Sequence, residues 1–311
     1  MKSAIFFASI LILLAGCGAQ KQSGPAETTL KIASFNMAFC RDTLDLKIWE
    51  ARKNSIMPVL EAGGFDICGS QEPYAFQVKF LAARAPQYGY VCGLLGDETP
   101  EKFAARPPKY HKRELVLPNM NNPIWYKKDK FDVLESGKFW YSKTPEKQSG
   151  GWEEDRWDAE RTCVWAKFRE KKTLKEFYVF NSHWLVAQNP RDAESVKSAR
   201  LLLAKIKEIA RGGAFFAMGD FNATDEFDSI KLLKSSGIMD SAKDSAKIGD
   251  PDAKKTFVGF YGESKKPVII DHIFASKNVK IESFKVGGYA PLDGAKANPS
   301  DHLPIMATAR F

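Results

Sequence analysis

The sequence predicts an α/β protein in which β-sheets pack together and helices lie outside them. Apolar stretches with strand-like alternation are interleaved with segments of helical spacing along the chain. The chain has 311 residues, of which 44% are hydrophobic and 12% aromatic, enough for one large domain or at most two. The sequence shows no internal repeat and no change of composition that would mark a second domain.

The predicted strands are short and are separated by turn residues. The first is "LKIASFN", in which apolar and polar residues alternate. The others are "FDICGSQ", "YGYVCGLL", "NPIWYKK", "FDVLESGKFWYS", "RTCVWAKFRE", "EFYVFNSHWL", "AFFAMGDFN", "KTFVGF", "KPVIIDHIFAS", "IESFKVGGYA" and "LPIMATARF". Residues 95–120 are polar, basic and proline-bearing, so we expect a long loop there.

Helical spacing occurs in four segments, which are residues 47–64, 73–86, 189–213 and 226–236. The clearest is "NPRDAESVKSARLLLAKIKEIARGG". We expect Asn189 to cap this helix, Pro190 to lie in its first turn and the paired glycines to end it. Its apolar face is expected to pack into the core rather than to bind a ligand.

The N-terminal segment differs from the rest of the chain. A basic residue precedes the apolar run 4–15, which is too short to span a bilayer and fits a secretory leader. The run ends in "LAGC", which resembles the lipobox of bacterial lipoprotein precursors. We therefore expect residues 1–16 to be a leader, Cys17 to carry lipid and residues 17–29 to be a flexible tether. An ordinary leader cleaved at a small residue is the alternative.

Such a leader predicts a lipid-anchored protein of the bacterial cell envelope, periplasmic or surface-exposed, with the membrane as a partner. Residues 30–311 would form a single domain, expected to be monomeric. Cys68 and Cys163 lie in apolar strands and are expected to be buried free thiols, whereas pairing of Cys40 and Cys92 is open. The formal net charge of +8 favours phosphodiesters, nucleic acid or an acidic membrane as partners, but also fits an ordinary basic surface.

Polar side chains occur where the predicted apolar strands end. They are Asn36, Glu72, His183, Asp220, Asn222 and Asp271 at strand ends, and Asp301 with His302 just before the last strand. Each alone could be a cap, a turn residue or a solvated acid. Because carboxylates, amides and imidazoles recur at six strand ends, the set predicts one site on a rigid scaffold.

These side chains suit metal-assisted chemistry on a phosphate. Glu72 and Asp301 offer the hard oxygen ligands that Mg2+ or Mn2+ prefers. Asp220 could fix a water or accept its proton, and the imidazoles could donate to phosphate oxygens or act as acid or base. Zinc and a serine nucleophile are less favoured, because the sequence has four histidines, no HExxH and no Gly-x-Ser-x-Gly.

The ordered motifs "SFNM", "QEP", "NSHW", "GDFNA", "IDHIF" and "SDHLP" resemble those of the endonuclease/exonuclease/phosphatase superfamily over residues 30–311. That superfamily includes DNase I-like nucleases, abasic-site endonucleases, sphingomyelinases and inositol polyphosphate phosphatases. The resemblance implies a DNase I-like four-layer α/β sandwich, with two mostly antiparallel sheets face to face and helices outside. It also implies hydrolysis of a phosphate mono- or diester by an activated water, with Mg2+ or else Mn2+ as cofactor and no covalent enzyme intermediate.

The resemblance further implies a role for each matching residue. Catalytic roles fall on His183, Asp220, Asn222, Asp271 and His302, phosphate binding on Arg161 and Asn36, and metal binding on Glu72 and Asp301. In these roles Asp271 orients His302, which faces the phosphate. Arg161 and Tyr126 could line the phosphate pocket or be structural, and Arg161 is favoured because guanidinium binds phosphate in bidentate fashion. His272 points opposite Asp271 in an alternating strand and is expected to be a packed or surface histidine.

The sequence leaves the substrate open among a small molecule, a lipid head group and nucleic acid. One alternative function is an extracellular DNase I-like endonuclease, whose affinity should fall steeply with salt. The basic loop 95–120 could supply its phosphate contacts or simply be solvated. A second alternative is a catalytically silent binding protein of the envelope.

Overall fold

The computed structural model describes residues 27–38, 43–93, 121–149, 151–152, 161–187, 189–260, 264, 267–288 and 298–311. The predicted leader, Cys17, most of the expected tether, Cys40 and loop 95–120 lie outside the described residues. Among the helices that are described, none combines the length and the apolar composition that a bilayer crossing needs.

Two six-stranded sheets form the centre of the molecule. The first has the order β11-β12-β1-β2-β4-β3, with β1 Thr29–Asn36, β2 Ile67–Gln71, β3 Tyr88–Val91, β4 Ile124–Lys127, β11 Lys280–Val286 and β12 Ile305–Arg310. The second has the order β5-β6-β7-β8-β10-β9, with β5 Phe131–Trp140, β6 Thr162–Glu170, β7 Glu176–His183, β8 Phe215–Asp220, β9 Met239–Ser241 and β10 Asp271–Ser276. Among these described strands, β1–β2 and β7–β8 pair in parallel and the remaining pairs are antiparallel.

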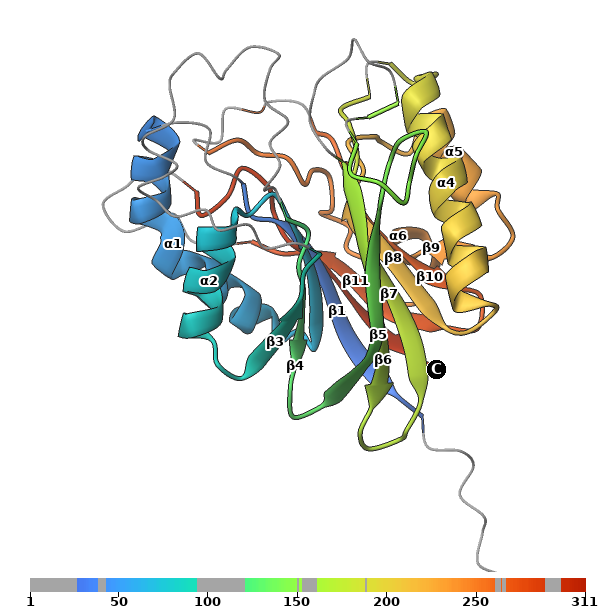
Figure 1. Cartoon of the computed structure of the whole chain (residues 1–311), viewed down its shortest axis with the longest axis horizontal. Helices are drawn as coiled ribbons and strands as arrows, with labels where there is room; N and C mark the ends of the chain where they lie inside the picture. Colours follow the sequence, from blue (N-terminus) through green and yellow to red (C-terminus); the bar gives the residue numbers. More distant parts are fainter. Residues whose placement is uncertain are drawn as a thin grey trace, which may run out of the picture.

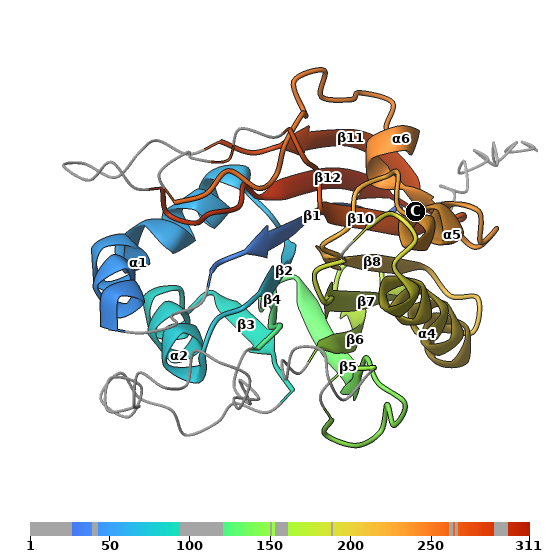
Figure 2. The same ribbon diagram turned by 90° about the horizontal axis from the view of Figure 1, so that it is seen from above.

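Helices cover the outer face of each sheet (Figures 1 and 2). Helices α1 (Thr43–Gly63) and α2 (Ala75–Arg84) pack on the first sheet, and α4 (Ala193–Ala210) and α5 (Asp228–Lys234) pack on the second. The short helix α6 (Ala242–Ser245) follows β9 directly. This arrangement confirms the predicted four-layer α/β sandwich.

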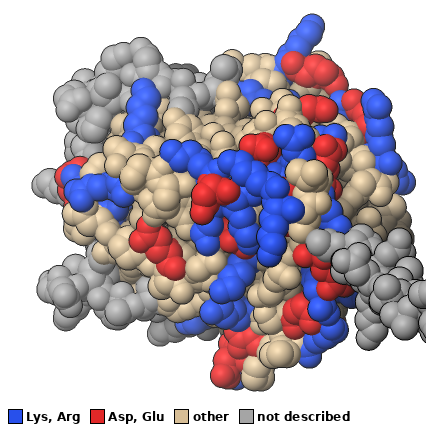
Figure 3. All heavy atoms as spheres, turned by 90° about the horizontal axis from the view of Figure 1, so that it is seen from below, with Lys and Arg blue, Asp and Glu red and all other residues tan. Residues whose placement is uncertain are grey.

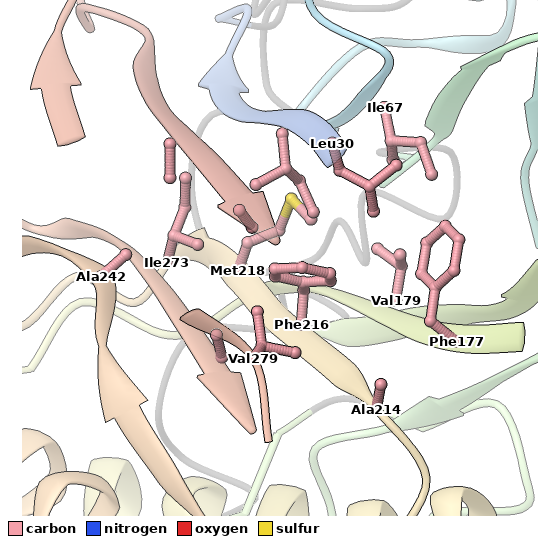
Figure 4. Close-up of a cluster of buried hydrophobic side chains, with 14 of the residues drawn as sticks. Leu30, Ile67, Phe177, Val179, Ala214, Phe216, Met218, Ala242, Ile273 and Val279 are labelled. Atoms are coloured by element: carbon pink, nitrogen blue, oxygen red, sulfur yellow. The ribbon is translucent and has the colours of Figure 1, made fainter. Parts of the chain in front are cut away.

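Alternation along the strands builds the layers. In β1, Leu30 and Ile32 point into the core between the sheets, while Ala33 and Phe35 pack toward α1 and α2. Figure 4 shows the inter-sheet core, in which Leu30 and Ile67 of the first sheet face Val179, Phe216 and their neighbours from the second. Both sheets are therefore buried on two faces, which fixes the strand register firmly.

Helix α4 begins later than the sequence analysis predicted. Its N-cap is Asp192, not Asn189, and the Asp192 carboxylate accepts hydrogen bonds from the backbone amides of Glu194 and Ser195 at 3.1 and 3.0 Å. The Asn189 side chain instead accepts from the Arg191 amide in a turn before the helix. Both residues are good caps, and the one adjacent to the helical run prevails.

The C-terminal third differs from prediction in two places. Residues of "KTFVGF" form a single bridge, Phe257 with His302, rather than a strand. Asp271 begins strand β10 instead of ending one, because β10 runs antiparallel to β8. The first residue of β10 therefore lies beside the last residue of β8, and Asp271 still reaches the edge where Asp220 lies.

The first described strand begins next to residue 30, where the sequence analysis places the start of the domain. Strand β1 starts at Thr29, and the preceding Thr28 is buried and exchanges two backbone hydrogen bonds with Phe311. Both sheets and their covering helices are built from residues after Glu27. The free thiols of Cys68 and Cys163 are buried as predicted, and Cys92 is a third free thiol.

Candidate active site

The predicted site residues meet at one edge of the sandwich. The parallel pair β1–β2 ends with Asn36 opposite Gln71, one residue before Glu72, and the parallel pair β7–β8 ends with His183 opposite Asp220. Asp271 lies across from Asp220 on β10. This edge is the upper one in Figure 1, opposite the start of β1.

Asn36 connects the acids of the two sheets. Its Nδ2 donates to Glu72 Oε1 and to Asp220 Oδ2, each at 3.0 Å, and its Oδ1 accepts from the Ala38 amide at 2.9 Å. The side chain is fully buried, and these bonds use both its amide hydrogens. The structure thus shows Asn36 orienting two carboxylates, and its assignment to phosphate binding stays a prediction.

His183 lies beside the same two acids. Its Nε2 is 3.7 Å from Glu72 Oε1 and 3.6 Å from Asp220 Oδ2. Burial, together with the charges of Arg161 and His302, holds the pKa of His183 well below its usual range. Because Arg161 Nη1 lies 2.8 Å from the ring Nδ1 and 2.6 Å from Nε2, a neutral ring accepts from the guanidinium.

His302 has the opposite charge state. Its Nδ1 donates to Asp271 Oδ2 at 2.9 Å, and its Nε2 is 3.7 Å from Asp220 Oδ2. Burial alone would lower the pKa of His302, but Asp271, Asp220 and Asp301 together raise it well above its usual range. This shift favours the protonated ring, and Asp271 holds the ring in orientation.

The two bridged acids are difficult to ionise together. Burial, Asp271 and Glu72 raise the pKa of Asp220 to about 7, against a lowering effect of His302. Burial and Asp301 raise the pKa of Glu72, against a lowering effect of its bond with Asn36. Crowded, buried carboxylates of this kind occur where a cation or a proton is to be bound.

Backbone geometry is unusual around these acids. Glu72 and Asn222 have positive φ angles of 78° and 50°. Left-handed conformations at such residues cost energy and concentrate at functional sites. The Asn222 amide donates to Asp220 Oδ1 at 2.9 Å and its side-chain Nδ2 donates to Trp184 O at 2.9 Å, so the turn after β8 aims Asp220.

Gly219 allows β7 and β8 to bring His183 and Asp220 side by side. Its φ is 145°, and a Cβ there would lie 1.8 Å from the backbone oxygen of Ser182. Only glycine fits this approach, which explains the glycine in "GDFN".

Two overlapping groups of side chains have the spacing of metal ligands. Glu72, His183 and Asp220 form one group, and Asp220, Asp271 and His302 form the other, with ligand atoms within 4.8 Å of one another in each. Among the described residues Asp301 is in neither group, although its charge acts on Glu72 and His302. Its assignment as a metal ligand stays a prediction.

The acids fit a hard divalent cation. The oxygens of Glu72 and Asp220 are close together, Asp220 is buried and Glu72 is largely buried, and both pKa values are raised. A cation beside them would offset their mutual repulsion. Arg161 supplies part of that positive charge. Burial lowers the pKa of its guanidinium, and the charges of Glu72 and Asp220 oppose that lowering.

Sequence reasoning missed a buried amide pair beneath the site. Asn181 Oδ1 accepts from Gln71 Nε2 at 2.7 Å, and Asn181 Nδ2 donates to the backbone oxygens of Ser70, Asn122 and Pro123 at 2.8 to 3.1 Å. These bonds join β2 of one sheet to β7 of the other just behind the edge where the predicted site residues meet. The signal was a polar residue inside each apolar strand, "CGSQ" and "FNSH".

Arg52 is a second residue that sequence reasoning missed. This buried side chain on α1 donates to the backbone oxygens of Met37, Ala38 and Pro299 at 2.5 to 2.9 Å. It therefore holds the segment after Asn36 against the segment before Asp301. An arginine in "IWEARKNSI" looks like a solvated helix residue, and only the fold shows otherwise.

Two other residues considered from the sequence lie outside the cluster. Tyr126 packs its ring against Phe168, with centroids 5.3 Å apart. His272 is buried with its Nε2 2.8 Å from Ala223 O, and in the alternating strand β10 it points away from Asp271, as predicted.

Comparison with known protein families matches residues 33–302 to the Endonuclease/Exonuclease/phosphatase family. The chain belongs to this family. Members of the endonuclease/exonuclease/phosphatase family are hydrolases that act on phosphate esters, and they typically depend on a divalent metal. The ordered motifs and the observed sandwich agree with this membership.

Solved structures and a curated relative resemble the chain over most of its length. A family protein of Bacteroides thetaiotaomicron has a TM-score of 0.76 at 28% identity, covering 92% of this chain and 96% of that one. A mannosyl-6-phosphatase of the same organism has a TM-score of 0.74 at 27% identity, covering 91% of this chain and 100% of that one. An uncharacterized protein of Acanthamoeba polyphaga mimivirus is 27% identical, covering 83% of this chain and 91% of its own length.

Proposed function

We propose that this protein is a metal-dependent phosphoesterase that hydrolyses a phosphate monoester through an activated water, with Mg2+ as cofactor and Mn2+ as a substitute. The observation that carries the proposal is the Asn36-bridged pair of Glu72 and Asp220, with a neutral and a charged histidine on either side. This constellation joins residues of both sheets at one edge.

Glu72, with Asp301 near it, would hold the cation, which supplies Lewis-acid stabilisation of charge on the phosphoryl group when bound. Asp220 would orient the attacking water and accept its proton. A pKa of about 7 suits that task, because the carboxylate is then partly ionised and still basic at neutral pH. The turn containing Asn222 holds Asp220 in place.

The two histidines would have different roles at the phosphate. His302, protonated and fixed by Asp271, can donate from Nε2 to a phosphoryl oxygen and stabilise its negative charge. His183 also lies beside Asp220, and the guanidinium of Arg161, which contacts His183, can bind a second phosphate oxygen. In this arrangement no side chain is needed as a nucleophile.

A sugar phosphate is the substrate class that we propose. The mannosyl-6-phosphatase similar to this chain over nearly its whole length supports a monoester of a sugar. Nucleic acid remains the alternative to test, because its binding would fall steeply with salt and hydrolysis of a small monoester would not.

The test is a substrate panel with Mg2+, with Mn2+ and with EDTA. It contains mannose 6-phosphate and other sugar phosphates, bis-p-nitrophenyl phosphate, inositol phosphates, sphingomyelin and plasmid DNA. We expect release of inorganic phosphate from sugar phosphates, abolished by EDTA and restored by Mg2+. Cleavage of DNA without sugar phosphate turnover would support the nuclease, and turnover of no phosphate ester would support the silent binding protein.

We also propose that Cys17 carries a lipid and places a monomeric enzyme at the cell envelope. The support is the "LAGC" sequence after a short apolar run. The wild-type chain expressed in a bacterium should incorporate labelled fatty acid and sediment with membranes, whereas Cys17→Ser should do neither. Light scattering on the purified protein tests the monomer.

A further inference from the structure

The turn between β6 and β7 presents an apolar side chain among lysines. Its residues 171–175 read "KKTLK", and Leu174 is 66% exposed. We call these five residues the basic turn. Figure 1 shows it at the bottom of the molecule, at the end of the strands opposite the site and close to the start of β1.

The basic turn is a closed structure that holds Leu174 outward. The Leu174 amide donates to Glu170 O at 2.8 Å, and the Glu170 amide donates to Lys175 O at 2.9 Å. Thr173 Oγ1 donates to the Glu170 carboxylate at 2.6 Å. Leu174 has a φ of 59°, a conformation that a leucine seldom adopts and that glycine would adopt at lower cost. An exposed leucine in a strained position is an outlier that calls for a function.

The start of the folded chain is bonded to this turn. Thr28 Oγ1 donates to Glu170 Oε2 at 2.6 Å and lies 2.6 Å from Thr173 Oγ1. Nine residues lie between Cys17 and Glu27, so ten residue steps (27 − 17 = 10) span at most about 36 Å. A lipid on Cys17 would therefore keep the basic turn within a short distance of the bilayer.

Lysines surround the exposed leucine. Figure 3, which views the molecule from below, shows Lys and Arg side chains spread across this face with acids among them. Lys128 and Lys172 are exposed, and Lys171 Nζ donates to the backbone oxygen of Lys128 at 2.6 Å, which joins the basic turn to the β4–β5 turn. Asp132 lies 3.7 Å from Lys171 of the basic turn, and Asp66 pairs with Lys127 and Lys130 on the same face, so the attraction of the face for anions is moderate.

We propose that the basic turn, with Leu174 at its tip, is the surface on which this protein rests against an anionic membrane. Its lysines match acidic head groups, and the leucine enters the boundary between head groups and acyl chains. A polyanion such as nucleic acid would use the lysines but gives the leucine nothing to contact. In the cell, the lipid anchor proposed above would bring the basic turn to the membrane. The contact itself depends only on the folded chain.

The test uses the unlipidated chain from residue 27 onward, which contains every described helix and strand. Sedimentation with vesicles of phosphatidylcholine, with and without phosphatidylglycerol, measures binding. We expect binding to the anionic vesicles that weakens as salt rises, and a loss of about fivefold or more in Leu174→Ser and in Lys172→Glu. The matched controls Ile248→Ser, at a side chain 70% exposed outside this turn, and Lys207→Glu on α4 should bind as the parent does.

A second variant at position 174 distinguishes loss of vesicle binding from loss of the fold. Leu174→Gly should unfold at the same or a higher temperature than the parent, because glycine relieves the strained φ, and should still lose vesicle binding. Binding of Leu174→Gly and Leu174→Ser equal to that of the parent would overturn the proposal. So would binding to DNA or heparin as strong as to vesicles, with no effect of Leu174. Turnover of sugar phosphate should be unchanged in all these variants, so this test fails or succeeds independently of the proposed activity.

Discussion

At the site end of the sandwich acids are crowded against one another, whereas at the opposite end a buried acid pairs with lysines that are partly exposed. Glu72 and Asp220 share one amide donor, and the pKa of each is raised by burial and by a neighbouring acid. At the other end, Lys127 and Lys130 lie 3.2 and 2.9 Å from the two oxygens of Asp66, with both lysines about one-third exposed.

The two ends differ in what their charged side chains contribute to stability. An ion pair with a partly exposed lysine adds little to stability when the acid keeps other partners, because water still solvates the lysine. Like charges that are buried together oppose folding, and they persist where they bind a ligand or move a proton. Substitutions at the site end should therefore reduce activity more than stability, and those at the opposite end should change both only slightly.

The largest expected effect is on turnover in Asp220→Asn. Removing the proton acceptor while keeping the hydrogen bond from Asn222 should lower kcat by about a thousandfold. Thermal unfolding of the metal-free variant should occur at the same or a higher temperature, because one of two crowded carboxylates is gone. Phosphate release and calorimetry measure the two quantities.

Asp225→Asn is the matched control, five residues farther along the chain. Asp225 pairs with Lys234 and Lys243 on the α5 side, and its pKa is lowered to about 2 by those lysines against the effect of burial. Its kcat should stay within about twofold of the parent. Equal losses in the two variants would contradict the assignment of Asp220 as the base.

The next largest effect is on stability in Asn181→Ala, behind the site. This change removes the partner of Gln71 Nε2 and of three backbone oxygens, all in a buried place. The free energy of unfolding should fall by about 3 kcal/mol. Denaturant unfolding measures it, and the exposed Asn189→Ala should change it by less than about 0.5 kcal/mol.

A smaller effect concerns pH. The pKa of Asp220 rises from an ordinary 3.8 to about 7 in the folded chain, so between these values the folded state binds more protons than the unfolded state. The contribution of Asp220 to stability is therefore greatest at low pH and falls as pH rises through 7. The stability of the metal-free parent relative to Asp220→Asn should fall by about 2 kcal/mol between pH 5 and pH 7.

In the presence of Mg2+, the stability of the parent relative to Asp220→Asn should instead rise with pH. A divalent cation favours the ionised acids, so its stabilisation of the parent should grow with pH. A difference between parent and variant that does not change with pH, in either condition, would rule out coupled ionisation at this pair.

The smallest effect is expected in Lys127→Met, at the opposite end. The Asp66 carboxylate keeps Lys130 and the backbone amide of Lys31 as partners, so the unfolding free energy should change by less than about 1 kcal/mol. Turnover should be unchanged. A loss of activity comparable to that of Asp220→Asn would contradict the conclusion that charged residues at the opposite end do not contribute to activity.

Much of the fold could be predicted from sequence because its longer strands are alternating or continuous apolar runs and its helices are periodic. The segments around Ile32, Phe180 and Leu202 have patterns that only one secondary structure accommodates. The predictions were wrong where the pattern is short or ambiguous. Strand β9 and helix α6 have three and four residues, and "KTFVGF" alternates like a strand but pairs at one residue.

The residues of the candidate site could be predicted from sequence, but the contacts that join them could not. Strand ends identify Glu72, Asp220 and His302 one at a time, since each follows or precedes an apolar run. Periodicity does not show which sheet a strand joins. The hydrogen bonds from Asn36 to Glu72 and Asp220, and those from Arg52 to two distant backbone segments, could therefore not be predicted. Their effects arise from contacts across hundreds of residues.

Strand β1 has a further consequence for what this enzyme can reach. It runs from Thr29, beside the basic turn, to Asn36 at the catalytic edge, so its seven steps separate those places by about 23 Å. An enzyme resting on its basic turn would present the edge that carries its site to the aqueous side. Head groups of the supporting bilayer would then lie out of range, and its natural esters would be solutes that arrive by diffusion.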